Sequence, residues 1–110
     1  MDNCVFCQIA RKEIPAKIRF EDDEVLAFDD MNRKSPIHIL VIPKKHIATL
    51  HEATAEDKEI ITKAFWRAKQ LADELKLFEP GFRITINNGD WAGQVVHHIH
   101  FHLMAGARDS

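Results

Sequence analysis

Residues 93–104 read Gly93-Gln94-Val95-Val96-His97-His98-Ile99-His100-Phe101-His102-Leu103-Met104. Within this stretch His98, His100 and His102 alternate with apolar residues. Successive side chains of an extended strand point to opposite faces. The alternation therefore predicts a strand that presents three imidazoles on one face and buries its apolar residues on the other.

Three imidazoles on one strand face indicate either a metal ion or a phosphoryl group. The Cα atoms of His98 and His102 would lie about 13 Å apart on a straight strand. A zinc ion with ligand bonds of about 2 Å is poorly served by three such ligands. A phosphoryl group above His100 fits better, since this histidine could attack phosphorus while its neighbours donate a proton or orient its ring.

The composition excludes several classes of protein. The chain has 110 residues, of which 45% are hydrophobic and 29% charged, so we expect one domain spanning residues 1–110. A formal net charge of -2 argues against a nucleic-acid partner that needs a basic face. No apolar run could span a bilayer, no signal peptide is recognisable, and two cysteines cannot form a secreted-type disulfide framework. We expect a cytoplasmic protein with no membrane partner.

The periodicity along the chain predicts an α+β fold with a largely antiparallel, five-stranded sheet. Besides the histidine strand, we expect strands at residues 18–20, 25–28, 36–43 and 82–87. A short N-terminal helix is expected near residues 4–10. A long helix should begin at Thr54, where Thr54-x-x-Asp57 is a capping signature, and end before Pro80 and Gly81.

The histidine stretch resembles the signature of the histidine triad (HIT) superfamily, His-x-His-x-His followed by two apolar residues. The resemblance extends along nearly the whole chain. Arg11-Lys12-Glu13-Ile14-Pro15-Ala16-Lys17, Glu21-Asp22-Asp23 and His38-Ile39-Leu40-Val41-Ile42-Pro43-Lys44-Lys45-His46 are similar to blocks of the Hint branch, the small nucleoside phosphoramidase-like proteins.

The resemblance implies roles for four histidines. His100 would be the nucleophile, forming a nucleotidyl-histidine intermediate that water then hydrolyses. His102 would contact the phosphate and protonate the leaving group, and His98 would orient the nucleophile from behind. His38 would be hydrogen-bonded into the same network, although a buried histidine on a strand can equally be an ordinary core residue.

The same resemblance implies a phosphate-binding turn and a nucleoside pocket. Gly93 would let backbone N–H groups approach an anion, and Gln94 would donate a hydrogen bond to developing charge. Val95 stands where the family often has Ser or Thr, so a hydroxyl contact is lost while a backbone contact can remain. Asp30 would bind the ribose hydroxyls. Asn87 would lie near the phosphate. An apolar slot for a purine base would be formed by Val5, Phe6, Ile9, Phe28 and Met31.

Cys4-x-x-Cys7 has the spacing of half a tetrahedral zinc site. The resemblance implies that His46 and His98 complete a structural zinc site. The alternative is a pair of buried free cysteines. With zinc bound, His98 would be a ligand and not free to move protons. No metal is expected in the catalytic chemistry itself.

Taken together, the sequence predicts a homodimeric, nucleotide-binding hydrolase of the Hint type that releases a purine nucleoside 5'-monophosphate from phosphoramidates. One alternative is a dinucleoside polyphosphate hydrolase of the Fhit type. Another is a nucleotide-binding or scaffold protein with weak catalysis. A third, an His-x-His metalloenzyme, lacks the remaining ligands at suitable positions.

Overall fold

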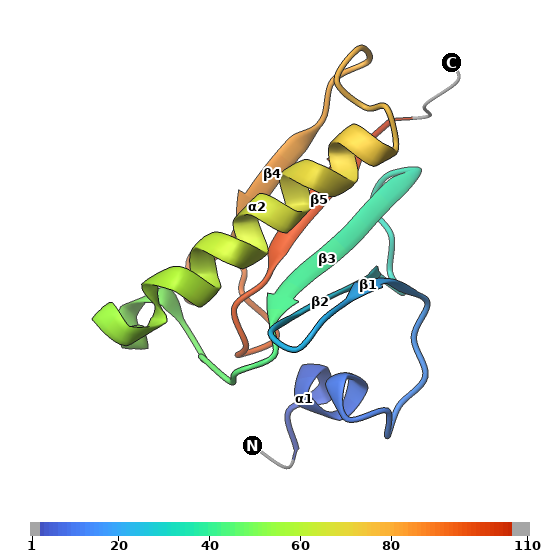
Figure 1. Cartoon of the computed structure of the whole chain (residues 1–110). Coiled ribbons are helices and arrows are strands. Elements are labelled where there is room, and N and C mark those ends of the chain that lie inside the picture. The colour runs from blue at the N-terminus through green and yellow to red at the C-terminus, as the bar shows by residue number, and fades with distance from the viewer. Residues whose placement is uncertain (1–2, 107–110) are drawn as a thin grey trace.

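The computed structural model of the chain describes residues 3–106 (Figure 1). Its helices are α1 (Val5–Ala10) and α2 (Lys58–Glu74), and two 3₁₀ turns, η1 (Leu50–Glu52) and η2 (Ala55–Asp57), precede α2. Its strands are β1 (Ile18–Glu21), β2 (Val25–Asp29), β3 (Ile37–Pro43), β4 (Arg83–Ile86) and β5 (Phe101–Ala105). They form one antiparallel sheet in the order β1-β2-β3-β5-β4. The predicted α+β fold is confirmed.

The two helices cover opposite faces of this sheet. α2 lies across one face, where its small buried residues Ala64 and Ala68 let it approach the strands closely (Figure 1). α1 packs Phe6 and Ile9 against the other face of β2 and β3. Because both faces of β3 are covered, this strand is the continuous apolar run seen in the sequence rather than an alternating one.

The long helix begins as the capping signature predicts. Thr54 and Asp57 form a reciprocal capping box around η2, which continues directly into α2. The Asp57 carboxylate also accepts a hydrogen bond from the Lys45 ammonium at 2.5 Å, and this contact lowers the pKa of Asp57. The start of α2 is thereby joined to the loop that follows β3.

The histidine strand is shorter than predicted. β5 begins at Phe101, so His98 and His100 lie in the segment that leads into it. β3 ends at Pro43, which has no N–H to donate to a longer ladder. The Ile99 amide instead donates to the carbonyl of Ile47, beyond the end of β3, at 2.8 Å. The chain therefore leaves the sheet just where the first two triad histidines stand.

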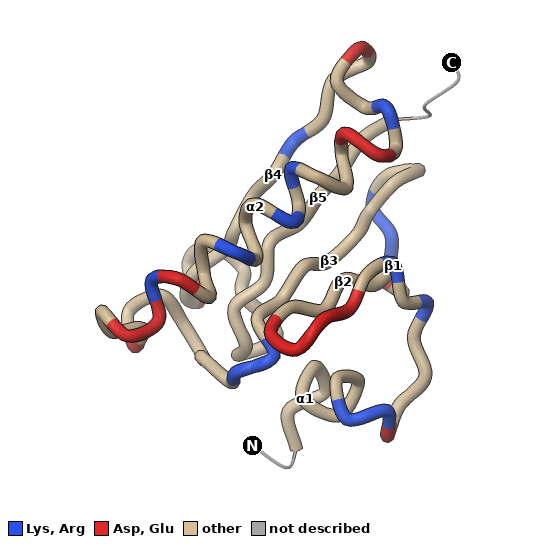
Figure 2. The backbone as a smooth tube through the Cα atoms, in the orientation of Figure 1, with Lys and Arg blue, Asp and Glu red and all other residues tan. Residues whose placement is uncertain are grey.

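Charged residues of both signs are interspersed along α2, whereas the turn between β1 and β2 is acidic (Figure 2). Among residues 3–106, no helix has the length and apolarity needed to cross a lipid bilayer.

Candidate active site

A cavity of about 660 Å³ opens on the sheet face that carries α1. His38 lines it, and so do all the residues predicted to bind nucleotide except Gln94. These residues are Val5, Phe6, Ile9, Phe28, Asp30, Met31, Asn87, Gly93, Val95, His100 and His102. The structure thus brings together residues that lie up to 97 positions apart in the sequence.

The register of the sheet explains why His38 and His102 meet. His102 on β5 lies directly opposite Leu40 on β3 and Thr85 on β4. Two residues along, Met104 lies opposite His38 and Arg83. Directly paired residues share a face of a sheet, so each set of three forms a row of side chains across the floor of the cavity. His38 and His102 stand in adjacent rows on neighbouring strands and are therefore diagonal neighbours.

The sequence reasoning missed the contribution of β4. Arg83 and Thr85 line the cavity, while Ile84 and Ile86 pack against the core under α2. The alternation of polar and apolar residues in this strand was the signal that could have identified them. It could not say which site the polar face would join.

His100 is held in the tautomer that a nucleophile needs. Its Nδ1–H donates to the carbonyl oxygen of His98 at 2.8 Å, which leaves a lone pair on Nε2 at the opposite edge of the ring. The ring is 6% exposed, and the edge of Phe6 packs against it with ring centroids 5.1 Å apart. Burial lowers the pKa of His100, so the imidazole is neutral at physiological pH.

A hydrogen-bond relay sets the proton position on His102. The Lys34 amide donates to His38 Nδ1 at 3.1 Å, which places the His38 proton on Nε2. That Nε2–H lies 2.9 Å from His102 Nδ1 and donates to it, so the proton of neutral His102 is carried on Nε2. Burial lowers the pKa of His102 to about 4. The cavity therefore holds one imidazole with a free lone pair and one with a free N–H.

Asp30 lies at the β2 edge of the cavity. Its Oδ1 accepts from the Asn32 amide at 2.7 Å, and its Oδ2 lies 3.4 Å from His38 Nε2. The carboxylate is therefore both a wall of the cavity and a neighbour of the His38 relay.

The predicted donor role of the Gln94 side chain is not met in this structure. Its Nε2 donates to the carbonyls of Ala48 and Val96, at 2.8 and 3.1 Å, and its Oε1 accepts from the Gly89 amide at 2.8 Å. Gln94 is 5% exposed and holds the loop together from inside. No sequence signal distinguishes these two uses of an amide.

The turn itself offers a different donor. The amides of Gly93 and Gln94 donate to Asp90 and Gly89, so neither is available to an anion. The Val95 amide has no acceptor among the described residues, and Val95 lines the cavity. Gly93 has φ +83°, a left-handed backbone conformation that glycine adopts without strain. It turns the chain two residues before the Val95 amide.

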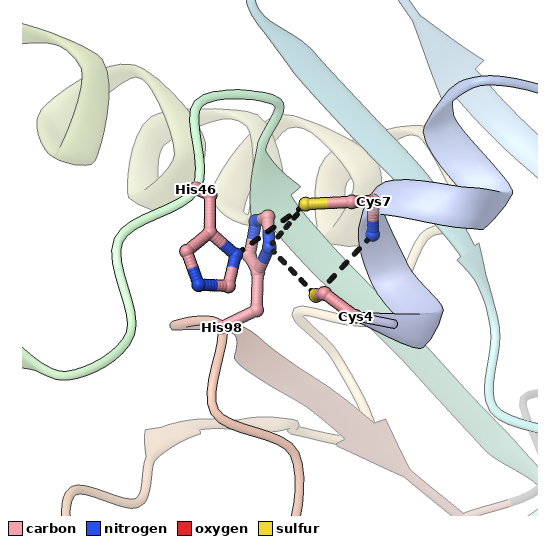
Figure 3. Close-up of side chains that lie close together, drawn as sticks. All are labelled: Cys4, Cys7, His46 and His98. Carbon is pink, nitrogen blue, oxygen red and sulfur yellow. Dashed lines mark hydrogen bonds between the residues drawn. The ribbon is translucent and has the colours of Figure 1, made fainter. Parts of the chain in front are cut away.

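The side chain of His98 points into a cluster with Cys4, Cys7 and His46 (Figure 3). Its Nε2–H donates to the Pro43 carbonyl at 2.7 Å, so Nδ1 carries a lone pair. This Nδ1 lies 3.5 Å from Cys4 Sγ and 3.6 Å from Cys7 Sγ. The predicted orientation of His100 by His98 thus comes from the backbone carbonyl and not from the imidazole.

The four side chains of this cluster fit a tetrahedral metal ion. All four ligand atoms lie within 4.8 Å of one another, and His46 Nδ1 is 3.4 Å from Cys7 Sγ. Ideal zinc bonds to sulfur and nitrogen give a tetrahedron edge of about 3.6 Å between those atoms. Burial raises the pKa of the Cys7 thiol to about 11, and a bound cation would reverse this shift because it favours the thiolate.

Comparison with known proteins identifies the family of the chain. The family model described as HIT domain matches residues 11–109. The chain is 42% identical over 104 residues to Protein HitA of Neisseria gonorrhoeae, with 94% of this chain and 96% of that protein covered. A HIT family hydrolase from Legionella pneumophila superimposes with a TM-score of 0.91 and 45% identity, covering 98% of this chain and 96% of that one.

A histidine triad nucleotide-binding protein from Candida albicans superimposes with a TM-score of 0.83 and 36% identity, covering 92% of this chain and 73% of that one. Both the sequence relatives and the solved structures therefore carry the same domain over nearly the full length of the chain. On this evidence the chain belongs to the HIT domain family.

Proposed function

We propose that this HIT family hydrolase releases a purine nucleoside 5'-monophosphate from phosphoramidates through a nucleotidyl-histidine intermediate on His100. One observation carries the proposal. The rings of His100 and His102 both line the cavity with centroids 4.8 Å apart, and their hydrogen bonds leave a lone pair on Nε2 of His100 and a proton on Nε2 of His102. A nucleophilic ring nitrogen and an N–H donor on the neighbouring ring are groups that cleavage of a P–N bond can use.

In the first step His100 Nε2 attacks phosphorus and a new N–P bond forms. The P–N bond to the leaving amine breaks, and the amine nitrogen takes the Nε2 proton of His102 in its imidazolium form, which the bound phosphoryl anion favours over the neutral ring. In the second step water attacks phosphorus while His102 Nε2, now bearing a lone pair, accepts a proton from that water. The N–P bond to His100 breaks, and the nucleoside monophosphate leaves. The free Val95 amide is available to stabilise the charge on the phosphoryl oxygens.

The rest of the cavity suits a nucleoside. Phe6 and Phe28 offer apolar walls for a flat base, with their ring centroids 5.4 Å apart and their planes nearly perpendicular. The Asp30 carboxylate is placed to accept hydrogen bonds from ribose hydroxyls.

A structural zinc ion is part of the proposal. Cys4, Cys7, His46 and His98 would hold it, and it would supply a cross-link between α1, the loop after β3 and the segment before β5. None of these four residues lines the cavity, so the ion would not contact the phosphoryl group.

A homodimer is also proposed. β4 is an edge strand whose outer backbone groups are unpaired within the described residues, and such edges invite pairing. Exposed aromatic rings lie near it, Phe65 on α2 and Phe78 and Phe82 on the connection to β4. Analytical ultracentrifugation of the wild type tests this part.

The catalytic proposal is tested by intact-protein mass spectrometry after rapid mixing with an adenosine phosphoramidate. We expect a transient adduct of one nucleotidyl group in the wild type, mapping to His100, and none in His100→Ala. His97→Ala is the matched control, since His97 is the exposed neighbour outside the cavity. An active His100→Ala enzyme would refute the assignment.

The same experiment separates the rival functions. Faster turnover of a dinucleoside polyphosphate than of a phosphoramidate would favour a Fhit-type hydrolase. Tight nucleotide binding without an adduct or turnover would favour a binding protein.

A further inference from the structure

A carboxylate, Asp30, lies beside the two imidazoles that form the hydrogen-bond relay. Its Oδ2 is 3.4 Å from His38 Nε2, and one polar atom each of Asp30, His38 and His102 lie within 4.8 Å of one another. His38 is buried and the Asp30 side chain is 20% exposed, so water screens the carboxylate charge only in part. A contact with ribose does not explain why this carboxylate stands so close to the relay.

The relay in its observed form leaves no place for a second proton on His102. The Lys34 amide donates to His38 Nδ1, so the His38 proton is on Nε2 and points at His102 Nδ1, 2.9 Å away. His102 becomes an imidazolium ion only by gaining a proton on this Nδ1, since Nε2 already carries one. Two N–H groups would then face each other without an acceptor between them.

Asp30 supplies the missing acceptor. When His102 Nδ1 carries a proton, the N–H of His38 needs another partner, and Asp30 Oδ2 lies 3.4 Å from that nitrogen. A carboxylate has about four acceptor sites, so Asp30 can take this N–H while it accepts from the Asn32 amide and from a ribose hydroxyl. Its negative charge also favours the imidazolium ion over the neutral ring.

The other groups around His102 oppose its protonation. The charged or titratable residues that line the cavity with it are Asp29, Asp30, Lys34, His38, Arg83 and His100. Burial is the main reason that the pKa of His102 is lowered to about 4, and the neighbouring imidazoles and the Lys34 charge add to this effect, whereas Asp30 raises the pKa. The second carboxylate, Asp29, is paired with the Arg19 guanidinium at 2.7 Å. Asp30 is therefore the acidic group in position to support a charged His102.

Two imidazoles and a carboxylate are also a familiar set of metal ligands. A metal ion would need a lone pair on His38 Nε2. The Lys34 amide keeps the His38 proton on that atom, because it occupies the lone pair of Nδ1. The hydrogen bonds therefore favour a proton over a metal ion between these three groups.

We propose that Asp30 is a positioning residue for acid catalysis, which accepts the N–H of His38 while His102 is an imidazolium ion and so makes that ion available. Its use in catalysis rests on the proposed function. A proton from solvent binds His102 Nδ1, and the hydrogen bond from His38 moves to Asp30 Oδ2. His102 Nε2 then gives its proton to the leaving amine, and Nδ1 keeps its own. After the second step returns a proton to Nε2, Nδ1 releases its proton to solvent and the relay re-forms.

The first measurement does not depend on turnover. Nitrogen-15 NMR follows His102 as the pH is lowered toward 4, in the wild type and in Asp30→Asn. An opposite charge within about 4–6 Å shifts a pKa by about 1–3 units, and the partial exposure of Asp30 favours the lower end. We therefore expect the protonated fraction of His102 at pH 4 to fall from about one half to about one tenth.

The variants are chosen to keep the fold. In Asp30→Asn the oxygen can still accept from the Asn32 amide, which leaves an NH₂ group facing His38. Asp30→Ser, whose hydroxyl can also accept from that amide, is the second variant and should show the same fall. Glu24→Gln is the matched control, because it makes the same change of charge in the exposed turn between β1 and β2, outside the cavity. An unchanged protonated fraction in either folded Asp30 variant, or an equal fall in Glu24→Gln, overturns the proposal.

Two substrates with the same nucleoside separate acid catalysis from nucleotide binding. An adenosine 5'-phosphoramidate releases an amine that needs a proton, whereas adenosine 5'-(4-nitrophenyl) phosphate releases a phenolate that does not. At saturating substrate, Asp30→Asn should slow amine release in the first turnover about tenfold and phenolate release by less than about twofold. Equal slowing for both substrates would mean that Asp30 acts only through the nucleoside, and would overturn the proposal.

The two measurements fail separately. If the wild type turns over neither substrate, the proposed function is wrong, and the NMR titration still decides whether Asp30 supports the charged form of His102. If both substrates are turned over and the titration of His102 is the same without Asp30, the proposed function stands and the role of Asp30 is wrong.

Discussion

Removing the imidazole of His38 should lower kcat without removing the nucleophile. His38 passes a hydrogen bond from the Lys34 amide to His102 Nδ1, with donor–acceptor distances of 3.1 and 2.9 Å. In His38→Ala the ring of His102 is free to carry its proton on either nitrogen. General acid catalysis contributes roughly 10²- to 10⁴-fold. Since the acid itself remains, we expect kcat to fall by less than the full effect, about 10- to 100-fold.

The same change should destabilise the fold. His38 is 3% exposed, so its removal leaves a small cavity and His102 Nδ1 without its donor. An unsatisfied buried acceptor costs about 1–3 kcal/mol, and the cavity adds to this. Urea unfolding should therefore show a loss of about 2–4 kcal/mol. His38→Gln keeps an N–H donor near the position of Nε2 and should recover part of both losses.

The assays are steady-state turnover of an adenosine phosphoramidate and nitrogen-15 NMR of the imidazoles. The wild type should show His102 protonated on Nε2 and His100 protonated on Nδ1. A folded His38→Ala protein with kcat within twofold of the wild type would refute the idea that the relay fixes the acid.

Two further predictions concern pH and metal. Burial lowers the pKa of His102 from its ordinary 6.5 to about 4, so between these values the unfolded chain binds the proton more readily than the folded one. The contribution of neutral His102 to the free energy of unfolding should be fully present above pH 6.5 and should fall as the pH approaches 4. The expected loss is about 1 kcal/mol by pH 5 after allowance for solvent screening. Urea titrations should show a shallower pH slope in His102→Asn, and an equal slope would contradict the reasoning. Cys7→Ser should abolish the expected binding of one zinc ion per chain, measured by elemental analysis, and hydrogen exchange should then accelerate in α1 before α2. Unchanged zinc content would rule out the cluster as the site.

Local patterns predicted most of the fold because they report local physics. The apolar run before Pro43 and the capping signature at Thr54 each placed an element close to its observed position. The end of the histidine strand was harder to place. It depends on where β3 stops and on the bond from the Ile99 amide to Ile47, neither of which is visible in residues 93–104 alone.

The candidate site likewise combines features that the local sequence predicts with features that depend on distant segments. Alternation predicts that His100 and His102 share a face, and both line the cavity, although His100 lies just before β5 and not within it. The direction of the His98 side chain and the partners of the Gln94 amide depend on side chains and carbonyls brought in from distant segments. Pattern reasoning has no access to such contacts, so it could not choose between the two predicted roles of His98, and it could not foresee that the Gln94 amide is already hydrogen-bonded to backbone carbonyls.

The short helix α1 connects the two sites of the molecule in an energetic sense. Its six residues are too few to be stable alone, and they supply Cys7 of the cysteine–histidine cluster as well as apolar walls of the cavity. An ion bound by Cys4 and Cys7 would order α1 before a nucleotide binds. The nucleotide would then lose less conformational entropy of Val5 and Phe6 on binding. The two binding equilibria are then linked, and a nucleotide must raise the affinity for the ion by the same factor by which the ion raises the affinity for the nucleotide.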